Sequence, residues 1–345
     1  MHANGDSTRT ALEAAERLLA ADRPLDAITA LTEANRARRD PAIEQRLVDI
    51  RHRSFSAVAQ RDVSELPPPV TASPVDTGEL PVLRREDLTL ATLREGLSRH
   101  GCVLVRGLVP SERAAALAAG IDAALSAFDE SAAAEGPPAA DGDGWYAPFK
   151  PRPGEYRTGG QRGWVRESGA VWTADSPRML FELLEVVDET GIGALVTEYL
   201  GERPALSANK CTLRRVPLTT STGWHQDGAF LGTEVRTLNL WLALAHCGRD
   251  APGLDVVPRR FDNIVEAGTA GAVFDWAVGE EVVQREAGAA GVLRPSFGPG
   301  DALLFDHFFL HSTAVTPEMT RERHAIETWF FSPSSYPKGQ IPLVY

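Results

Sequence analysis

The sequence contains little cysteine, with three in 345 residues: Cys102, Cys211 and Cys247. An odd number of widely spaced cysteines without a CxxC pair excludes a disulfide framework and argues against a thiolate metal site. Free cysteines are commonly buried, so we expect three buried thiols. A chain of this length can bury a core of normal size, so it needs neither disulfides nor a structural metal in order to fold.

Basic charge and long apolar runs are also lacking. The formal net charge is -12, and the isoelectric point is about 5.2. A nucleic acid partner requires a basic face, so that class of partner is excluded. No apolar run approaches the roughly 20 residues that span a bilayer, and the first residues lack the basic and apolar segments of a signal peptide. We therefore expect a cytoplasmic protein that does not enter membranes.

Residues 1–60 are predicted to form a helical segment. Apolar residues recur there at helical spacing, and the pattern is interrupted at Asp22-Arg23-Pro24 and at Asp40-Pro41. The first two helices resemble one tetratricopeptide-type hairpin, with small residues at Ala27 and Ala34. Because such repeats need about three copies to be stable alone, the segment either packs on the main domain or docks a protein partner.

Residues 61–85 are rich in proline and predict an extended linker. Beyond it, residues 86–345 begin with a helix, a short buried strand and a second helix at 112–128 that Ser111 caps. One helix then covers 178–200, and 259–290 form a helical or irregular insertion. The order of helices followed by short strands favours an α+β protein, mainly β, with a sandwich or barrel core. The strands are expected at 205–216, 237–245, 254–258, 302–307 and 325–332.

Residues 129–177 are expected to be irregular because they are rich in glycine and proline. The part from 145 to 170 combines aromatic with basic side chains, of which Trp145, Lys150, Arg157 and Trp164 are the candidates for substrate contact. Long irregular segments of this kind are often lids or binding loops. We interpret the segment as a lid over an anionic or carrier-bound substrate; the alternative is a solvated surface loop whose aromatics cover the core.

A candidate metal site begins at His225-Gln226-Asp227. Residues two apart on a strand point to the same face, so His225 and Asp227 can reach one ion. His311, after the predicted strand 302–307, offers a third ligand. Two histidines and one carboxylate with open positions are typical of non-heme Fe(II) oxygenases, although a zinc hydrolase also uses such ligands.

Arg323 favours the oxygenase. It begins an alternating strand on which Arg323, Ala325, Glu327 and Trp329 share a face. A guanidinium directed into the core needs an anionic partner, and its planar fork pairs bidentately with a carboxylate. The distal carboxylate of 2-oxoglutarate suits it, and the hydroxyl of Thr313 or Ser312 would add a hydrogen bond. Arg321 competes for this role.

Residues 86–335 resemble the phytanoyl-CoA dioxygenase family. The resemblance rests on the stretches 224–227, 240–244 and 252–258, on Gly300-Asp301, and on His311 and Arg323. It implies a double-stranded β-helix, a jelly-roll or cupin-like core. The Pro-Gly-Ser-His turn that is usual in the family is replaced by Pro258-Arg259-Arg260-Phe261, so no substrate role is inferred there.

The resemblance also implies site residues. Fe(II) is bound by His225, Asp227 and His311, and 2-oxoglutarate by Arg323 with Thr313. Trp241 matches a position that borders the co-substrate, and Asn239 lies on the same face. Gln226, between two ligands, is a further candidate for substrate contact.

The sequence therefore predicts a dioxygenase that uses Fe(II), 2-oxoglutarate and O2 to hydroxylate, or otherwise oxidise, an unactivated C–H bond of a small-molecule or carrier-bound substrate. Succinate and CO2 are the co-products. The carboxylate of Asp227 argues against a halogenase, in which an open position admits halide. Two alternatives stay open: a metal-dependent hydrolase or isomerase on the same barrel, and a non-catalytic binding protein that uses its N-terminal helices.

Overall fold

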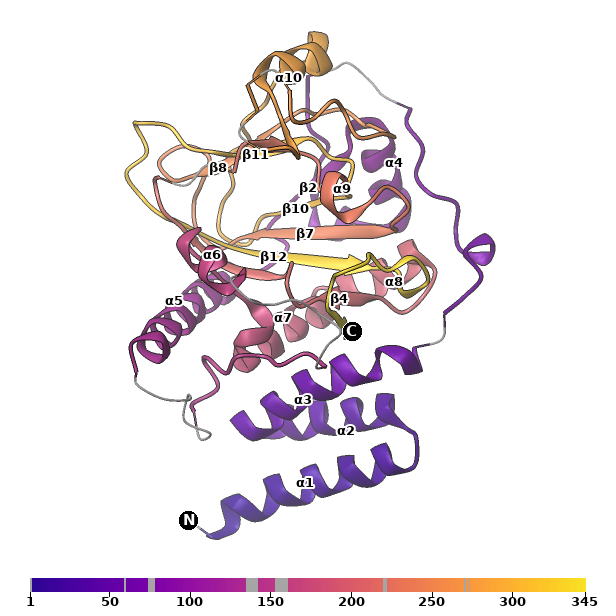
Figure 1. The fold of residues 1–345 in the computed structure, drawn as a ribbon, viewed down its shortest axis with the longest axis vertical. Coiled ribbons are helices and arrows are strands. Elements are labelled where there is room, and N and C mark those ends of the chain that lie inside the picture. Colours follow the sequence, from indigo (N-terminus) through magenta and orange to yellow (C-terminus); the bar gives the residue numbers. More distant parts are fainter. Residues whose placement is uncertain are drawn as a thin grey trace.

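The computed structural model describes residues 2–58, 60–73, 78–134, 142–152, 161–219, 222–269, 271–272 and 274–345. Its core is a double-stranded β-helix of two facing sheets that do not close into a barrel (Figure 1). Helices flank this core, so the protein is α+β as predicted. Within the described residues, no helix has the length and apolar character needed to cross a lipid bilayer.

The larger sheet has nine strands among the described residues, and β7 and β12 run through its centre. In antiparallel strands, directly opposed residues have their side chains on the same face of the sheet, so the register shows which residues share a face. Glu327 of β12 is opposite Trp241 of β7 and Thr212 of β5. The strands are β1 (Val82–Arg84), β2 (Cys102–Arg106), β3 (Ala170–Trp172), β4 (Ala205–Ser207), β5 (Thr212–Val216), β7 (Thr237–Ala243), β10 (Ala302–Phe305), β12 (Arg323–Phe331) and β13 (Pro342–Val344).

The smaller sheet has the order β8-β11-β6-β9 and covers the inner face of the larger one. Its strands are short, with two to four residues each. They are β6 (Trp224–His225), β8 (Gly253–Val256), β9 (Ala277–Val278) and β11 (His311–Ala314).

Helices cover the outer face of the larger sheet (Figure 1). The long α5 packs against β3, β5 and β12, and α7 packs against α5. This arrangement leaves the inner face of the large sheet for the site. The helices after the N-terminal segment are α4 (Leu90–His100), α5 (Ser111–Ala133), α6 (Gln161–Glu167), α7 (Pro177–Glu189), α8 (Ile192–Leu200), α9 (Gly228–Leu231) and α10 (Glu280–Ala287).

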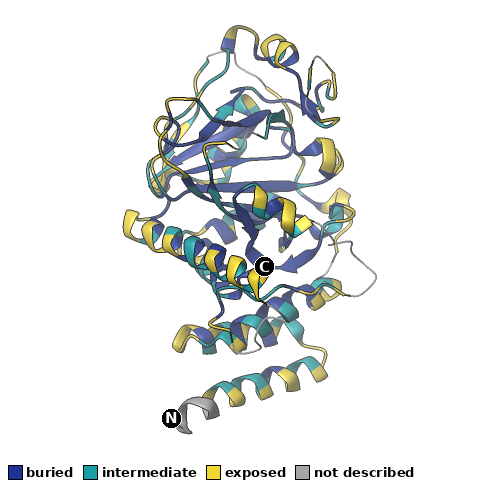
Figure 2. Cartoon of the chain, turned by 60° about the vertical axis from the view of Figure 1, so that its left-hand side comes forward, coloured by how far each residue is buried: buried dark blue, intermediate teal, exposed yellow. Residues whose placement is uncertain are grey.

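Three helices form the N-terminal segment: α1 (His2–Ala20), α2 (Pro24–Ala37) and α3 (Pro41–Arg53). They stack in a layer beside α7, with α1 outermost and exposed along its outer side (Figure 2). Phe181 of α7 shares their apolar core. Buried Arg51 donates to the carbonyl of Val344 in β13. The segment is therefore packed on the β core.

Several expected boundaries were wrong. The expected helix at 178–200 is two helices, because Gly191 adopts φ 77° and ends the first. Pro110, not Ser111, occupies the N-cap of α5, and that helix continues to Ala133. The expected strand at 205–216 is divided into β4 and β5 by a turn. The irregular segment contains α6 and β3 as well. The three cysteines are free and buried, as predicted.

Candidate metal and co-substrate site

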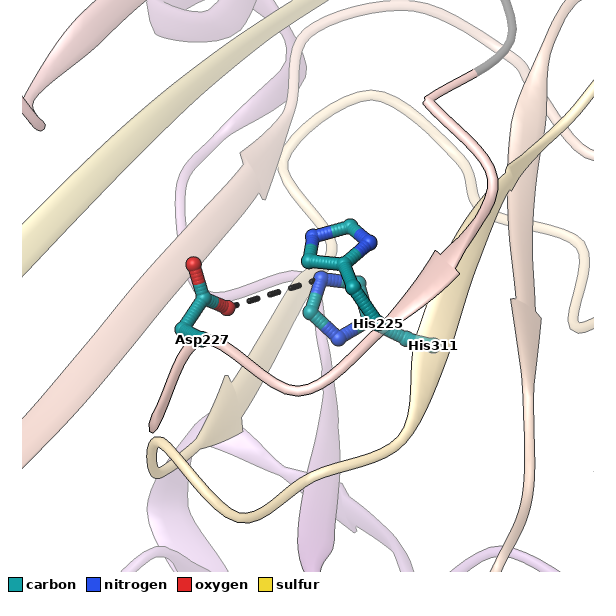
Figure 3. A group of neighbouring side chains, drawn as sticks. All are labelled: His225, Asp227 and His311. Carbon is teal, nitrogen blue, oxygen red and sulfur yellow. Dashed lines mark ion pairs between the residues drawn. The ribbon is translucent and has the colours of Figure 1, made fainter. Parts of the chain in front are cut away.

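Three potential ligands converge on the inner side of the smaller sheet (Figure 3). His225 and His311 are opposed in the β6–β11 pair, and their ring centroids lie 4.4 Å apart. The Nε2 atom of His311 lies 3.8 Å from Oδ2 of Asp227. One ligand atom from each of the three residues lies within 4.8 Å of the others, and these are the candidate metal ligands found among the described residues.

Asp227 does not reach this position by strand alternation, which corrects the expected geometry. Strand β6 ends at His225, and Asp227 has helical dihedrals (φ -62°, ψ -24°) at the N-cap of α9. The turn is held by the amide of Gly228, which donates to the carbonyl of His307 at 2.8 Å. A Cβ at Gly228 would lie 2.6 Å from Cδ1 of Ile264 and 3.1 Å from the carbonyl oxygen of His307, so a larger residue would require these neighbours to shift.

Both imidazoles are oriented by the backbone. Nδ1 of His225 lies 2.9 Å from the carbonyl of Gly223, and Nδ1 of His311 lies 3.1 Å from the carbonyl of Phe309. A carbonyl only accepts, so each Nδ1 carries the proton and each Nε2 keeps its lone pair for a metal. Burial, with the neighbouring His311, lowers the pKa of His225 to about 3, so this imidazole is neutral. Burial also raises the pKa of Asp227, and a bound cation would offset that cost.

Gln226, between two of these ligands, does not line the cavity. It is fully buried, and its amide nitrogen donates to the carbonyls of Asn263 and Phe308. Its oxygen accepts from the amide of Val265. The carboxamide is therefore used inside the protein, and the structure does not support substrate contact. His307 is also separate from the triad, with its Nε2 3.4 Å from the carbonyl of Thr233.

Arg323 is buried, and no acidic side chain among the described residues bonds to it. One guanidinium nitrogen donates to the carbonyl of Gly253 at 2.7 Å, while Nε has no partner. The group lies over the ring of Trp241, 5.3 Å from its centroid. Burial lowers its pKa to about 10, and the nearby Arg214 adds to this effect. Arg321, the competing candidate, is exposed.

Two other predicted residues, Asn239 and Thr313, are also buried polar groups. Asn239 is fully buried, and neither polar atom of its side chain has a partner. It is two residues from Trp241 on β7, so both side chains face inward. Thr313 is buried, and its hydroxyl accepts from that of Thr222 at 3.2 Å. Buried polar atoms without partners are rare in proteins. Partnerless polar atoms on both Arg323 and Asn239 fit a bound polar anion.

A cavity of about 560 Å³ opens over His225 and Asp227. Its wall includes an ion pair that the sequence did not predict, in which Arg214 of β5 donates to Glu327 of β12 at 2.9 Å. Although burial opposes ionisation, Arg214 and the hydroxyl of Thr212 hold the pKa of Glu327 at about 2. Strand alternation predicted that Glu327 lies on the inner face, but the sequence did not predict that β12 pairs with β5. The remaining wall is mainly aromatic, with Trp164, Trp172, Phe230, Phe274, Trp276 and Trp329.

The four candidates from the expected lid separate in the structure. Trp164, on α6, lines the cavity. Trp145 instead packs against Arg178 of α7, 5.2 Å from ring centroid to guanidinium carbon. Lys150 lines a different cavity, with α3 residues such as Asp49. Arg157 lies outside the described residues. Proximity along the chain did not correspond to proximity in the fold, because α6 and β3 carry the later part of the segment to the sheet.

Comparison with protein families identifies the chain. The sequence model of the family described as Phytanoyl-CoA dioxygenase (PhyH) matches residues 97–315, well over half of the chain. The chain belongs to the phytanoyl-CoA dioxygenase family. Phytanoyl-CoA dioxygenase-like proteins are Fe(II)- and 2-oxoglutarate-dependent oxygenases, so this chain is an oxygenase-type enzyme that uses iron, 2-oxoglutarate and O2. The match includes the three candidate ligands and ends before Arg323.

Solved structures give weaker similarities. EctD from S. alaskensis with 2-oxoglutarate and 5-hydroxyectoine is 16% identical over 81% of this chain and 87% of its own, with a TM-score of 0.49. AviO1 from Streptomyces viridochromogenes Tue57 is 17% identical over 73% and 98%, with a TM-score of 0.44. The TM-scores are low, so the family match carries the assignment to the phytanoyl-CoA dioxygenase family. No curated protein matches the sequence.

Proposed function

We propose that the protein oxidises an unactivated C–H bond of a small molecule, with hydroxylation as the outcome, and that His225, Asp227 and His311 hold the iron. The observation that carries this proposal is the convergence of two imidazoles and one carboxylate, of which His225 and Asp227 line an aromatic cavity. When bound, iron with 2-oxoglutarate and O2 supplies the oxidising power, and succinate and CO2 are released. The donor set fits Fe(II), since it leaves positions open for co-substrate and O2.

We assign Arg323 to the distal carboxylate of 2-oxoglutarate. Its carbonyl contact, Gly253, is three residues along β8 from Val256, which is opposite His311. Three strand residues span about 10 Å, a separation that suits a short dicarboxylate with one end at the triad. Thr313, on the same stretch of β11, supplies a hydroxyl, and Trp241 with Asn239 borders the bound chain. Both partnerless atoms of Asn239 would then have hydrogen-bond partners.

The chain's own residues position the reactants and exclude water. The Nδ1 hydrogen bonds fix the ring planes of His225 and His311, and the carboxylate of Asp227 fills the position that a halide would need. The Arg214–Glu327 ion pair forms part of the cavity wall without leaving an unpaired charge there. Aromatic side chains cover the remainder, which is suited to holding a carbon skeleton close to the triad.

Anaerobic reconstitution tests this function. Fe(II) and 2-oxoglutarate added to the purified protein should produce a visible absorption band, which Asp227→Ala abolishes. Admission of O2 should then yield succinate, slowly without substrate and faster with it. A hydrolase or isomerase would work without O2 and 2-oxoglutarate, and a binding protein would tolerate Asp227→Ala. Absence of both the band and succinate would contradict the proposal.

We further propose that residues 86–345 form the catalytic domain and that 61–85 link it to the helical segment. The described part of the linker is held against the catalytic domain by arginines. Arg236 donates to the carbonyl of Pro67, and Arg94 donates to the carbonyl of Pro68. Arg260 donates to that of Val70. The linker thus follows the surface of the domain.

A further inference from the structure

One cation in the cavity has no role in the site described so far. Lys210 lies in the turn between β4 and β5 and lines the cavity together with Asp227 and Glu327. Lysine is scarce in this protein: Lys150, Lys210 and Lys338 are its three lysines, and arginine supplies the other 32 of the 35 basic residues.

The two cations of the cavity differ in their partners. Arg214 is paired with Glu327 at 2.9 Å. Within the described part of the chain, the side chain of Lys210 forms no hydrogen bond or ion pair. Its ammonium lies over the ring of Phe230 instead, 3.7 Å from the centroid. Among the described residues of the cavity wall, Lys210 is thus the cation without a directly bonded partner. Asp227 and Glu327 act on it only through longer-range electrostatics, and they are taken up by the candidate metal site and by Arg214.

A second donor adjoins this charge. The side-chain oxygen of Asn209 accepts from the amide of Ile341 at 3.0 Å, which fixes the orientation of its carboxamide. Its Nδ2 therefore carries two hydrogens and has no partner among the described residues, and Asn209 also lines the cavity. An ammonium and an amide N–H2 on the wall of one cavity donate hydrogen bonds and accept none, which is the chemistry that recognises an oxyanion.

Beside these donors, the cavity has an apolar entrance. Three large hydrophobic side chains on its wall are strongly exposed: Trp164 at 62%, Phe274 at 46% and Phe230 at 36%. Phe274 stacks on Trp276, with centroids 4.9 Å apart and planes 8° apart, and Trp276 contacts the ring of His225 edge-on. Exposed aromatic surface that leads to a metal site fits a flat or extended carbon skeleton.

We propose that Lys210, assisted by Asn209, is the substrate-anchoring group, and that the substrate is an organic anion whose carboxylate or phosphate binds there while its apolar part lies along Phe230, Phe274 and Trp276. The inference rests on the proposed function, because it takes this cavity as the substrate side of the iron site. Lys210 then holds the substrate at one end, and the C–H bond to be oxidised is presented to the triad. Its role is specificity, separate from the co-substrate contact at Arg323.

The test is calorimetric titration of the full-length protein, loaded with Mn(II), with three matched probes: 2-naphthoate, 2-naphthyl phosphate and the neutral 2-naphthalenemethanol. Hydrogen bonds to a charged group make a large net contribution, so the preferred anion should bind at least about tenfold more tightly than the alcohol. The carboxylate and phosphate arms show which oxyanion is preferred. Equal binding of the three probes, or binding of none, overturns the proposal.

Three variants make the test specific. Lys210→Met should remove the preference for the anion while changing alcohol binding little, and Lys210→Arg should retain most of it. Lys150→Met, in the cavity beside α3, is the matched control and should bind all probes as wild type does. Thermal melts confirm that each variant is folded.

Three results would count against Lys210 as the anchor: unchanged anion preference in Lys210→Met, weaker Mn(II) binding with unchanged preference, or a weakened 2-oxoglutarate titration alone. Weaker Mn(II) binding would indicate that Lys210 supports Asp227 as a metal ligand. A weakened 2-oxoglutarate titration would indicate that Lys210 binds the co-substrate. The probe titration needs neither turnover nor 2-oxoglutarate. A protein that shows the anion preference but no Fe(II)–2-oxoglutarate band would contradict the proposed function while leaving the anion site in place.

Discussion

His225 and His311 are direct partners across the β6–β11 strand pair, with ring centroids 4.4 Å apart and both Nδ1 atoms directed at backbone carbonyls. The pairing makes metal binding depend on the smaller sheet, because the two histidines come together only where β6 pairs with β11. His311 belongs to a strand that also pairs with β8, so the same strand connects the triad to the region of Arg323.

Replacing His311 by alanine should weaken Fe(II) or Mn(II) binding by roughly 100-fold or more, since loss of even an outer-shell partner costs 10- to 100-fold. His307→Ala is the matched control, because that side chain lies close in sequence but is directed toward the carbonyl of Thr233. Metal content after dialysis and Mn(II) titration by electron paramagnetic resonance measure the effect. Equal losses in the two variants would contradict the assigned triad.

Arg323→Ala should raise the dissociation constant for 2-oxoglutarate by about 10- to 150-fold, because a charge-assisted hydrogen-bond pair contributes about 1.5–3 kcal/mol. Arg321→Ala should leave it unchanged, because Arg321 is exposed. Anaerobic titration of the visible band measures both constants. The reverse pattern would transfer the co-substrate role to Arg321.

Glu327→Gln should destabilise the protein more near neutral pH than in acid. The pKa of Glu327 lies at about 2 in the folded protein, against an ordinary value of 4.5 for a glutamate. A carboxyl group whose pKa is lowered by folding stabilises the folded protein at pH values above its pKa in the unfolded state. This stabilisation is lost as the pH falls from about 4.5 toward 2. The shift corresponds to at most about 3 kcal/mol. Urea unfolding of wild type and variant at about pH 6 and about pH 3.5 should show a difference that shrinks in acid; a constant difference would show that ionisation of Glu327 does not contribute.

Ile50→Ala should lower the stability of the catalytic domain, because Ile50 lies in the apolar cluster that α3 shares with Phe181 of α7. Truncation of a buried isoleucine costs about 2–5 kcal/mol, whereas Arg36→Ala, at a partly exposed ion pair, should cost less than about 1 kcal/mol. All seven tryptophans lie beyond residue 60, so their fluorescence reports on the catalytic domain alone. An unchanged tryptophan-monitored midpoint in Ile50→Ala would show that the helical segment unfolds independently.

Much of the fold could be predicted because local patterns determine it. The helical breaks near Pro24 and Pro41 and the alternation along β12 follow from backbone chemistry and side-chain period. The predictions failed where tertiary contacts decide the conformation. Asp227 was expected on a strand but lies at a helix N-cap, in a turn that the carbonyl of His307 holds.

Substrate contacts were the least predictable part of the site. Trp145 and Lys150 belong to the same basic-aromatic segment as Trp164, yet only Trp164 lines the cavity over the triad. Lys210, in a short turn between two strands, carried no local signal at all. Which side chains line a cavity depends on strand pairing between distant segments, and a single sequence does not encode that pairing as a local pattern.

The sequence by itself determined the chemistry of this protein. A His-x-Asp triplet, a distal histidine and an inward arginine form an unusual set of donors that can be recognised before their positions in the fold are known. Only the tertiary structure decided how these donors are used. It paired His225 with His311, buried Arg323 with no carboxylate bonded to it among the described residues, and placed Lys210 on the cavity wall. Side-chain type sets which ions and groups can be bound, whereas burial and partner geometry decide which charges remain available to bind them.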